Sequence, residues 1–267
     1  RNYDFFRDKM ERNIEAKEYF SSEAKTYYKK HYGNPDNPKV YPNLYLRHRY
    51  ILTLIKREVI KGKTKVLDIG CGSGIMAKDL LDMGCEVWAA DISNDMINAT
   101  KKTVGKNKKI HYSIQDIENL KFNEKFDIII ASGVIEYLRE DSLWIKSVKK
   151  ILNKEGVVVV SIQNKIALPR IGVELADKFL PKKIRNKIFT LEQHRRHNPI
   201  KLDSDLKKAG FIKSGYRYFH FYPFLIPFDR IFPKLYVWLG KKMEVFTQTF
   251  IGTLFATGYV IKAKLVK

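Results

Sequence analysis

The stretch KVLDIGCGSGIMAKDLLDMGCEVWAADIS, residues 65–93, decides the fold. Three glycines, at positions 70, 72 and 74, follow a short apolar run, and Asp91 ends the next apolar run. Glycine has no Cβ, so the backbone can turn sharply there and approach a ligand closely. A strand, a glycine loop, a helix and a second strand ending in an acidic residue are typical of a nucleotide-binding crossover. We therefore predict that a nucleotide-type ligand binds at this loop.

The spacing of the glycines distinguishes between two kinds of nucleotide ligand. A dinucleotide loop of the form G-x-G-x-x-G would carry glycine at position 75, but this chain has Ile75 there and its third glycine one residue earlier. Asp68 precedes the loop, and a carboxylate suits the amino and sulfonium groups of S-adenosylmethionine better than it suits a diphosphate. Asp91 can accept hydrogen bonds from both ribose hydroxyls. The pattern therefore predicts S-adenosyl-L-methionine as the cofactor and disfavours NAD.

Strand-like and helical patterns alternate on both sides of this stretch. The segments SDLKKAGFIKSGYRYF and ATGYVIKAKLV add a helix with a strand and a closing strand. Such alternation predicts an α/β fold with a doubly wound, mostly parallel seven-stranded sheet covered on both faces. The first five strand-like runs are Val66–Ile69, Glu86–Ala90, Ile110–Ile114, Phe126–Ala131 and Val157–Ile162.

The 267 residues are consistent with one domain that carries insertions. We expect a helical lead-in over residues 1–60, including a second amphipathic helix in LYLRHRYILTLIKREVI, and a cofactor-binding core over 61–163. Residues 164–200 and 220–250 interrupt the alternating series after strand ends. Insertions at these places usually build the substrate side of the crevice.

Four stretches together resemble the motifs of class I S-adenosylmethionine-dependent methyltransferases, in particular the small-molecule and lipid-type members. These stretches are VLDIGCGSG, VWAADIS, SIQDIENL and FDIIIASGVIEYL. Upstream, FSSEAKTYY is similar to the F-x-x-x-A-x-x-Y lead-in helix of small-molecule members. The resemblance implies a Rossmann-like fold and methyl transfer as the activity.

The same resemblance implies a set of cofactor-binding residues. Asp68 and the glycine loop would face the methionine part, Asp91 and Ile92 the ribose and adenine, and Asp116 the adenine amino group. Many relatives carry histidine where this chain has Glu136 and Tyr137, so the resemblance supplies no catalytic base. The full set implied is Tyr27, Asp68, Gly70, Cys71, Gly72, Gly74, Asp91, Ile92, Asp116, Ile117 and Ser132.

The stretch EQHRRHNP supplies candidates for the chemistry on the substrate side. A hydroxyl nucleophile must lose a proton, and histidine is the natural general base, so His194 and His197 are the predicted catalytic residues. Arg195 and Arg196 can bind an anionic group of the acceptor in bidentate fashion. His220, in the second insertion, is predicted to contact the substrate as well. A solvated basic turn is the alternative interpretation of EQHRRHNP.

The composition constrains the partners. A formal net charge of +21 attracts polyanions such as RNA or an anionic membrane. However, the lysines occur in scattered pairs, and ASGVIEYL stands where an N-P-P-[YF] type motif of RNA enzymes would be expected, so nucleic acid is not favoured. Cys71 and Cys85 form neither a C-x-x-C pair nor a zinc-site pattern, so we expect no metal and a reducing, cytoplasmic location.

The stretch YFHFYPFLIPFDRIFPKLYVWLG is rich in aromatics and proline and is interrupted by charges. It could lie on the headgroup zone of an anionic membrane, line an apolar acceptor pocket, or form a packed cap over the sheet. Residues 245–261 carry no charge, but Gly, Thr and Gln interrupt this run and the sheet needs it for its closing strand, so we do not expect a membrane span.

These observations lead to one function with alternatives. We expect methyl transfer to a hydroxyl of a small or lipid-linked acceptor, such as a lipid, quinone or glycan precursor, with peripheral contact at the inner face of a membrane. RNA methylation, N-methylation of a lipid headgroup or another amine, and cofactor binding without turnover are the alternatives. The sequence leaves the acceptor and the oligomeric state open.

Overall fold

The computed structural model describes residues 37–38, 40–138, 140–172, 195–223 and 231–266, together with Glu18. The strands form one seven-stranded sheet in the order β3-β2-β1-β4-β5-β7-β6. Strands β1 to β5 pair in parallel, and β7 runs antiparallel to both of its neighbours, which confirms the predicted sheet. The strands are β1 Lys65–Ile69, β2 Glu86–Asp91, β3 Ile110–Ile114, β4 Phe126–Ser132, β5 Leu152–Gln163, β6 Phe211–Phe221 and β7 Ala256–Leu265.

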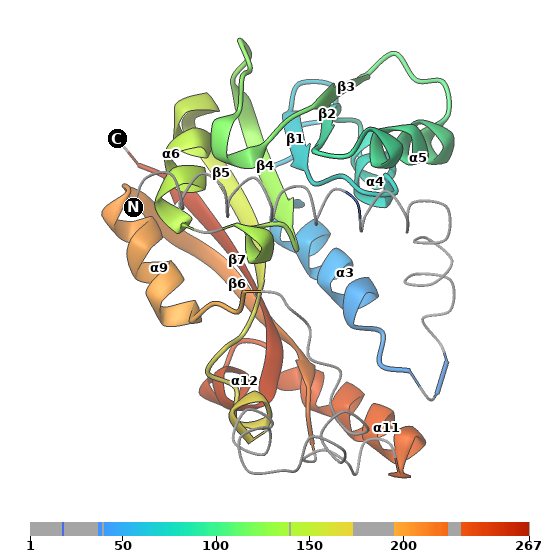
Figure 1. Ribbon diagram of the computed structural model, residues 1–267, viewed down its shortest axis with the longest axis vertical. Coiled ribbons are helices and arrows are strands. Elements are labelled where there is room, and N and C mark those ends of the chain that lie inside the picture. The colour runs from blue at the N-terminus through green and yellow to red at the C-terminus, as the bar shows by residue number, and fades with distance from the viewer. Residues whose placement is uncertain are drawn as a thin grey trace.

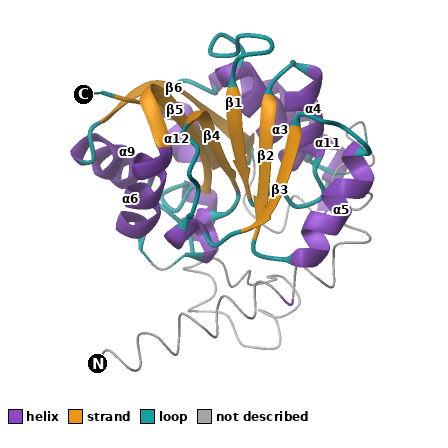
Figure 2. Cartoon of the chain, turned by 90° about the horizontal axis from the view of Figure 1, so that it is seen from above, coloured by secondary structure: helices purple, strands orange, loops and turns teal. Residues whose placement is uncertain are grey.

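Helices cover both faces of this sheet (Figure 2). Successive residues of a strand point to opposite faces, so Val66 packs with α3 and α4 while Leu67 packs with α6 and α9. The apolar runs read from the sequence are continuous because both faces are buried. The helices are α3 Asn43–Ile55, α4 Ile75–Asp82, α5 Asn94–Val104, α6 Asp141–Ile151, α9 Pro199–Lys208, α11 Pro233–Met243 and α12 Phe250–Phe255, with short 3-10 turns η1 Ile117–Asn119, η2 Ile135–Tyr137 and η3 Glu244–Phe246.

Strands β6 and β7 carry the C-terminal helices at one end of the molecule. Helices α11 and α12 lie together there, away from α4 and α5 (Figure 1). The uncharged run before the closing strand divides into η3, α12 and the start of β7. Among the described helices, none is long and apolar enough to cross a membrane.

The predicted helix over residues 44–60 is shorter than expected, because α3 ends at Ile55 and a turn follows. The first part of the helical lead-in, which contains FSSEAKTYY, lies outside the described residues, apart from Glu18. The carboxyl ends of β1, β2, β4 and β5 meet at one edge of the sheet, since these strands are parallel. The predicted site residues that follow these strands therefore lie on the same edge.

Candidate active site

The glycine loop after β1 has a conformation that other residues rarely adopt. Gly70, Gly72 and Gly74 have φ values of 69°, 55° and 82°. A Cβ on Gly74 would lie 2.8 Å from the Cα of Thr100, whereas a Cβ on Gly72 would find its nearest atom, the Gly70 carbonyl oxygen, at 3.9 Å. Gly74 is therefore required by packing against α5, and Gly72 leaves open space beside the backbone, as a ligand cradle needs.

Asp91, at the end of β2, holds this loop in place. Its Oδ2 accepts a hydrogen bond from the Gly72 backbone N–H at 3.1 Å, and its Oδ1 accepts one from the Ser93 N–H at 2.9 Å. Thr100 Oγ1 donates to the Gly72 carbonyl oxygen at 2.9 Å from the other side. Burial raises the pKa of the Asp91 carboxyl. Each carboxylate oxygen retains a lone pair for a ribose hydroxyl, so the predicted ribose contact fits this geometry.

Asp68 is the clearest sign of a cationic ligand. Its residue is 1% exposed, and its Oδ2 has no hydrogen-bond partner among the described residues. Burial, and then the nearby Asp91 carboxylate, raise the pKa of Asp68 to about 7. A buried carboxylate without a partner is costly, and a cation placed beside it would remove that cost. The charged methionine end of S-adenosylmethionine meets this requirement, so the residues present fit this cofactor.

The remaining predicted cofactor residues have different surroundings. Asp116 caps η1 by accepting a hydrogen bond from the Glu118 N–H at 2.9 Å, and Ile117 is buried beside it. Cys71 Sγ lies 3.3 Å from Thr100 Oγ1 in a fully buried position, and burial raises its pKa well above the usual thiol value. The Cys71 side chain is thus part of the packing behind the loop. Ile92 and Ser132 are partly exposed at the ends of β2 and β4.

Arg47, on α3, lies against the cofactor edge of the sheet and was not among the predicted site residues. Its guanidinium Nη1 lies 2.5 Å from where a Cβ of Gly133 would be, so it packs directly on the backbone after β4. Arg47 shares a helix face with Ile51 and Leu54, which are buried. A cation on the apolar stripe of an amphipathic helix is costly without a partner, and this was the signal in the sequence.

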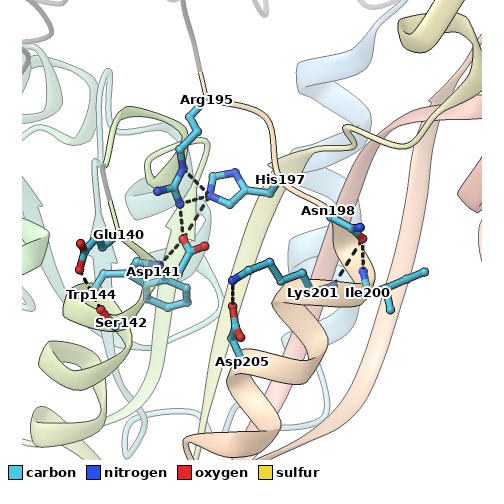
Figure 3. Close-up of polar contacts among 10 residues, drawn as sticks. All are labelled: Glu140, Asp141, Ser142, Trp144, Arg195, His197, Asn198, Ile200, Lys201 and Asp205. Carbon is cyan, nitrogen blue, oxygen red and sulfur yellow. Dashed lines mark hydrogen bonds and ion pairs between the residues drawn. The ribbon is translucent and has the colours of Figure 1, made fainter.

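The segment after residue 194 runs beside the cofactor edge. The Arg195 N–H donates to the Glu136 carbonyl oxygen at 3.0 Å, and His197 forms a parallel bridge with Asn164 just beyond β5. The side chains of Arg195 and His197 converge on Asp141, the first residue of α6 (Figure 3). The sequence analysis placed both residues on the substrate side but did not identify Asp141.

In this network His197 Nε2 lies 2.5 Å from Arg195 Nη2 and 3.1 Å from Asp141 Oδ1. Burial alone would raise the pKa of Asp141, but hydrogen bonds from His197 and Trp144 and the charge of Arg195 outweigh it and lower that pKa to about 2. The His197 side chain is 4% exposed, and its Nδ1 has no partner among the described residues. Nδ1 is therefore the ring nitrogen of His197 without a partner in the described part of the chain, and it is buried.

Arg196 lines a cleft of about 810 Å³ between α6 and α9. The cleft is rich in cations, with Lys146, Lys165 and Lys201 among its lining residues. An anionic group of an acceptor could enter this cleft, as the prediction for Arg195 and Arg196 requires. His194 and Tyr27 lie outside the described residues.

His220 ends up among different partners from those of His197. Its Nδ1 lies 2.9 Å from Thr257 Oγ1, and its Nε2 lies 3.3 Å from the Tyr236 hydroxyl. Burial, together with the charge of Arg170, lowers the pKa of His220 to about 3, so the ring is neutral at physiological pH. Its φ of 61° is unusual for a residue with a side chain, and such strain concentrates at functional positions.

The described residues contain no cluster of three or more histidine, cysteine or acidic side chains arranged for a metal ion.

Residues 67–160 match the family described as "Methyltransferase domain". This segment therefore resembles a methyltransferase domain. It is similar to the ubiquinone biosynthesis O-methyltransferase of Pelagibacter ubique, with 34% identity over 122 residues that make up 44% of this chain and 51% of the relative. The relative from Haemophilus ducreyi is 33% identical over 148 residues, 51% of this chain and 61% of the relative.

The chain thus spans less than two thirds of the length of these relatives. Solved structures extend the likeness beyond residues 67–160. Magnesium protoporphyrin IX methyltransferase from Synechocystis PCC 6803, with bound SAH, superposes with a TM-score of 0.63 at 17% identity, over 95% of this chain and 99% of that one. N-methyltransferase NodS from Bradyrhizobium japonicum gives 0.55 at 14%, over 87% and 99%. This likeness shows that the chain shares the fold of these two structures over most of its length, in agreement with the predicted Rossmann-like sheet.

Proposed function

We propose that this chain transfers a methyl group from S-adenosylmethionine to a hydroxyl of a small acceptor of quinol or phenol type, free or lipid-linked. The buried, unpartnered Asp68 carboxylate beside the glycine loop carries the cofactor part of this proposal. The hydroxyl part draws on relatives named as O-methyltransferases, which match the cofactor-binding segment. The acceptor's identity within this class stays open.

Different residues of the chain would bind and orient different parts of the cofactor. Bound S-adenosylmethionine supplies an activated methyl group on a sulfonium sulfur. Asp68 would balance the positive methionine end, Arg47 would hold its carboxylate above Gly133, and Asp91 would fix the ribose. Methyl transfer needs the nucleophile, the methyl group and the sulfur in line, with water excluded. The glycine loop around Gly72 would hold the cofactor, and with it the sulfur, in place for this alignment.

The acceptor hydroxyl must give up its proton to a group of the protein or to solvent. We assign this role to His197 through Nδ1, with Asp141 fixing the ring from the opposite nitrogen, or to His194. Arg195 is already paired with Asp141, so in this proposal it positions the base more than it binds an anion. Arg196, at the cleft, is the better candidate for an anionic group of the acceptor.

Binding and turnover can test the two parts separately. Isothermal titration with S-adenosylmethionine and with NAD should show binding of the first only, and tighter binding of NAD would refute the cofactor assignment. Incubation of the enzyme with labelled methyl donor and a cell extract, sorted into lipid, RNA and protein fractions, should label the lipid-soluble fraction. Label confined to RNA or protein would refute the acceptor class.

One observation favours N-methylation as a second candidate. His197 Nε2 is occupied by Arg195 and Asp141, so the base is available at one nitrogen only. An amine acceptor can arrive without its proton and requires no base. Full activity after His194→Ala and after His197→Ala would make this second candidate the better one.

Quinol-type acceptors with a lipid tail partition into membranes. The proposal therefore includes a cytoplasmic enzyme in peripheral contact with the inner face of an anionic membrane. The charge of +21 is consistent with such contact, since basic proteins are attracted to anionic leaflets.

A further inference from the structure

Helix α11 carries apolar residues on two opposite faces. Tyr236, Val237 and Gly240 form the inner face and are buried against the rest of the molecule. Leu235, Trp238 and Lys242 lie at helical spacing on the opposite side of α11. Ile231, just before the helix, and Val245, in η3, flank them, and we call these five residues the α11 outer face. The inner face alone suffices to dock the helix, so the outer face needs another explanation.

The apolar side chains of the α11 outer face are strongly exposed. Ile231, Leu235, Trp238 and Val245 are 58%, 46%, 57% and 76% exposed. The neighbouring positions Phe232, Phe250 and Ile251 add further exposed apolar surface from the same end of the molecule. Single exposed apolar residues are ordinary, but a contiguous group marks an interaction site.

In the described stretch from residue 231 to 251, all exposed charged side chains are lysines. Lys234, Lys241 and Lys242 are exposed on α11, and the Lys242 Nζ lies 6.0 Å from the centre of the Trp238 ring. The acidic residue of this part of the chain, Glu244, is turned inward, where it accepts hydrogen bonds from the hydroxyls of Tyr41 and Tyr50. The partner of this surface must therefore be apolar in part and negatively charged.

We infer that the α11 outer face docks on the surface of an anionic lipid bilayer. Trp beside Lys is the combination that favours the headgroup zone, where the ring meets the acyl boundary and the ammonium meets phosphate. With 11 residues, α11 is too short to span a bilayer and would lie in the plane of the interface. A second copy is disfavoured, because a two-fold contact through this face would bring Lys234, Lys241 and Lys242 of both copies together.

Docking by this face would orient the acceptor side toward the lipid. The inner face of α11 contacts His220, a predicted substrate-side residue: the Tyr236 hydroxyl lies 3.3 Å from His220 Nε2, and the rings of Tyr236 and Tyr41 are 5.9 Å apart. This consequence rests on the proposed function, because it matters only if the acceptor is lipid-soluble. The docking surface itself does not depend on it.

Vesicle flotation tests the surface with matched variants. The wild type should bind vesicles of phosphatidylcholine with phosphatidylglycerol and release at high salt. Leu235→Ser with Trp238→Ser should reduce binding by about tenfold or more. The matched control is Ile114→Ser with Ile212→Ser, which removes side chains of similar exposure, 58% and 59%, on the sheet. This control should bind like the wild type.

A second pair of variants tests the charge. Lys241 and Lys242 occupy the last turn of α11, as Lys101 and Lys102 occupy the last turn of α5. Lys241→Gln with Lys242→Gln should weaken binding to anionic vesicles severalfold. Lys101→Gln with Lys102→Gln should leave this binding nearly unchanged. Thermal unfolding and S-adenosylmethionine titration confirm that each variant is folded.

Several results would overturn the inference. Failure of the wild type to bind anionic vesicles at any salt concentration would do so, as would equal binding by the α11 and control variants. The surface would be assigned to a second copy by a different result. In that case the wild type would not bind vesicles but would form concentration-dependent dimers in sedimentation velocity, and Leu235→Ser with Trp238→Ser would abolish these dimers. Methyl transfer to a water-soluble phenolic acceptor without vesicles should be unchanged in the α11 variants. Vesicle binding by a chain without that activity would refute only the proposed methyl transfer to a phenolic acceptor.

Discussion

The cofactor side of the sheet edge and the acceptor side are held together by contacts of very different sequence separation. Asp91 reaches Gly72 across 19 residues and Thr100 reaches it across 28. The proposed acceptor side includes His220, whose N–H donates to Glu244, and Tyr41 and Tyr50 reach this Glu244 across 203 and 194 residues. The cofactor side is thus one local unit, whereas the part of the proposed acceptor side around His220 depends on contacts that join Tyr41 and Tyr50 to Glu244.

This difference has a functional meaning. A local unit can keep its geometry while the distant segments change, because its hydrogen bonds do not depend on them. The same cofactor can therefore serve different acceptors on one fold. In this chain the acceptor side is also where the strained, neutral His220 and the outward-facing α11 occur.

The largest expected effect concerns the acceptor side alone. His197→Ala should lower turnover by about 10²–10⁴-fold, because the hydroxyl proton loses its acceptor, while S-adenosylmethionine affinity stays nearly unchanged. Steady-state kinetics and cofactor titration check the two readouts. Arg196→Ala is the comparison, since it should mainly raise the KM of an anionic acceptor. A matching loss of cofactor affinity in His197→Ala would show that the two sides are not independent.

The next effect is a pH dependence that belongs to the cofactor side. The folded pKa of Asp68 is about 7 against 3.8 for an ordinary carboxyl. The native state thus holds its proton more tightly than the unfolded chain. The free energy of unfolding of the cofactor-free protein should fall as pH rises from about 4 to 7, by at most about 1.4 kcal/mol per pH unit.

Denaturant unfolding across that pH range measures this dependence. Asp68→Asn should flatten it, because the amide does not titrate, and bound S-adenosylmethionine should reduce it in the wild type. Asp205→Asn is a control on a partly exposed carboxyl, which pairs with Lys201 on α9. An unchanged slope in Asp68→Asn would assign the dependence to another group, with Asp91 the first to consider.

A third prediction tests how rigidly the local unit is specified. Gly74→Ala places a Cβ 2.8 Å from the Thr100 backbone and keeps φ at 82°, whereas Gly62→Ala, at φ 78°, meets nothing within 4 Å. Both substitutions carry the conformational cost of about 1 kcal/mol, but Gly74→Ala adds a steric cost of about 1–3 kcal/mol. Chemical denaturation compares the two. Equal losses would show that the loop can shift away from α5.

The same contrast explains what could be predicted from the sequence. The parallel sheet, the glycine loop and Asp91 follow from short patterns whose partners lie nearby, so their placement was correct. Asp141 was missed because its partner Arg195 is 54 residues away, and a lone aspartate at a helix start reads as an ordinary N-terminal charge. Arg47 and Glu244 were missed for the same reason, since their meaning depends on the tertiary structure.

The smallest expected effect probes the long-range contact that closes the acceptor side. The Tyr50 hydroxyl donates to Glu244 Oε2 at 2.7 Å, and the Glu244 carboxyl also accepts from Tyr41 and from the His220 N–H. Tyr50→Phe removes one donor from a buried carboxylate and should lower the free energy of unfolding by about 1–2 kcal/mol. Tyr45→Phe, one turn earlier on a partly exposed position of α3, should change it by less than about 0.5 kcal/mol. S-adenosylmethionine affinity should be unchanged in both variants, because the loop at Gly72 has no bond to this contact. Weaker cofactor binding in Tyr50→Phe would mean that the loss of the Tyr50–Glu244 contact reaches Arg47, three residues before Tyr50, through α3. The cofactor side would then depend on the acceptor side.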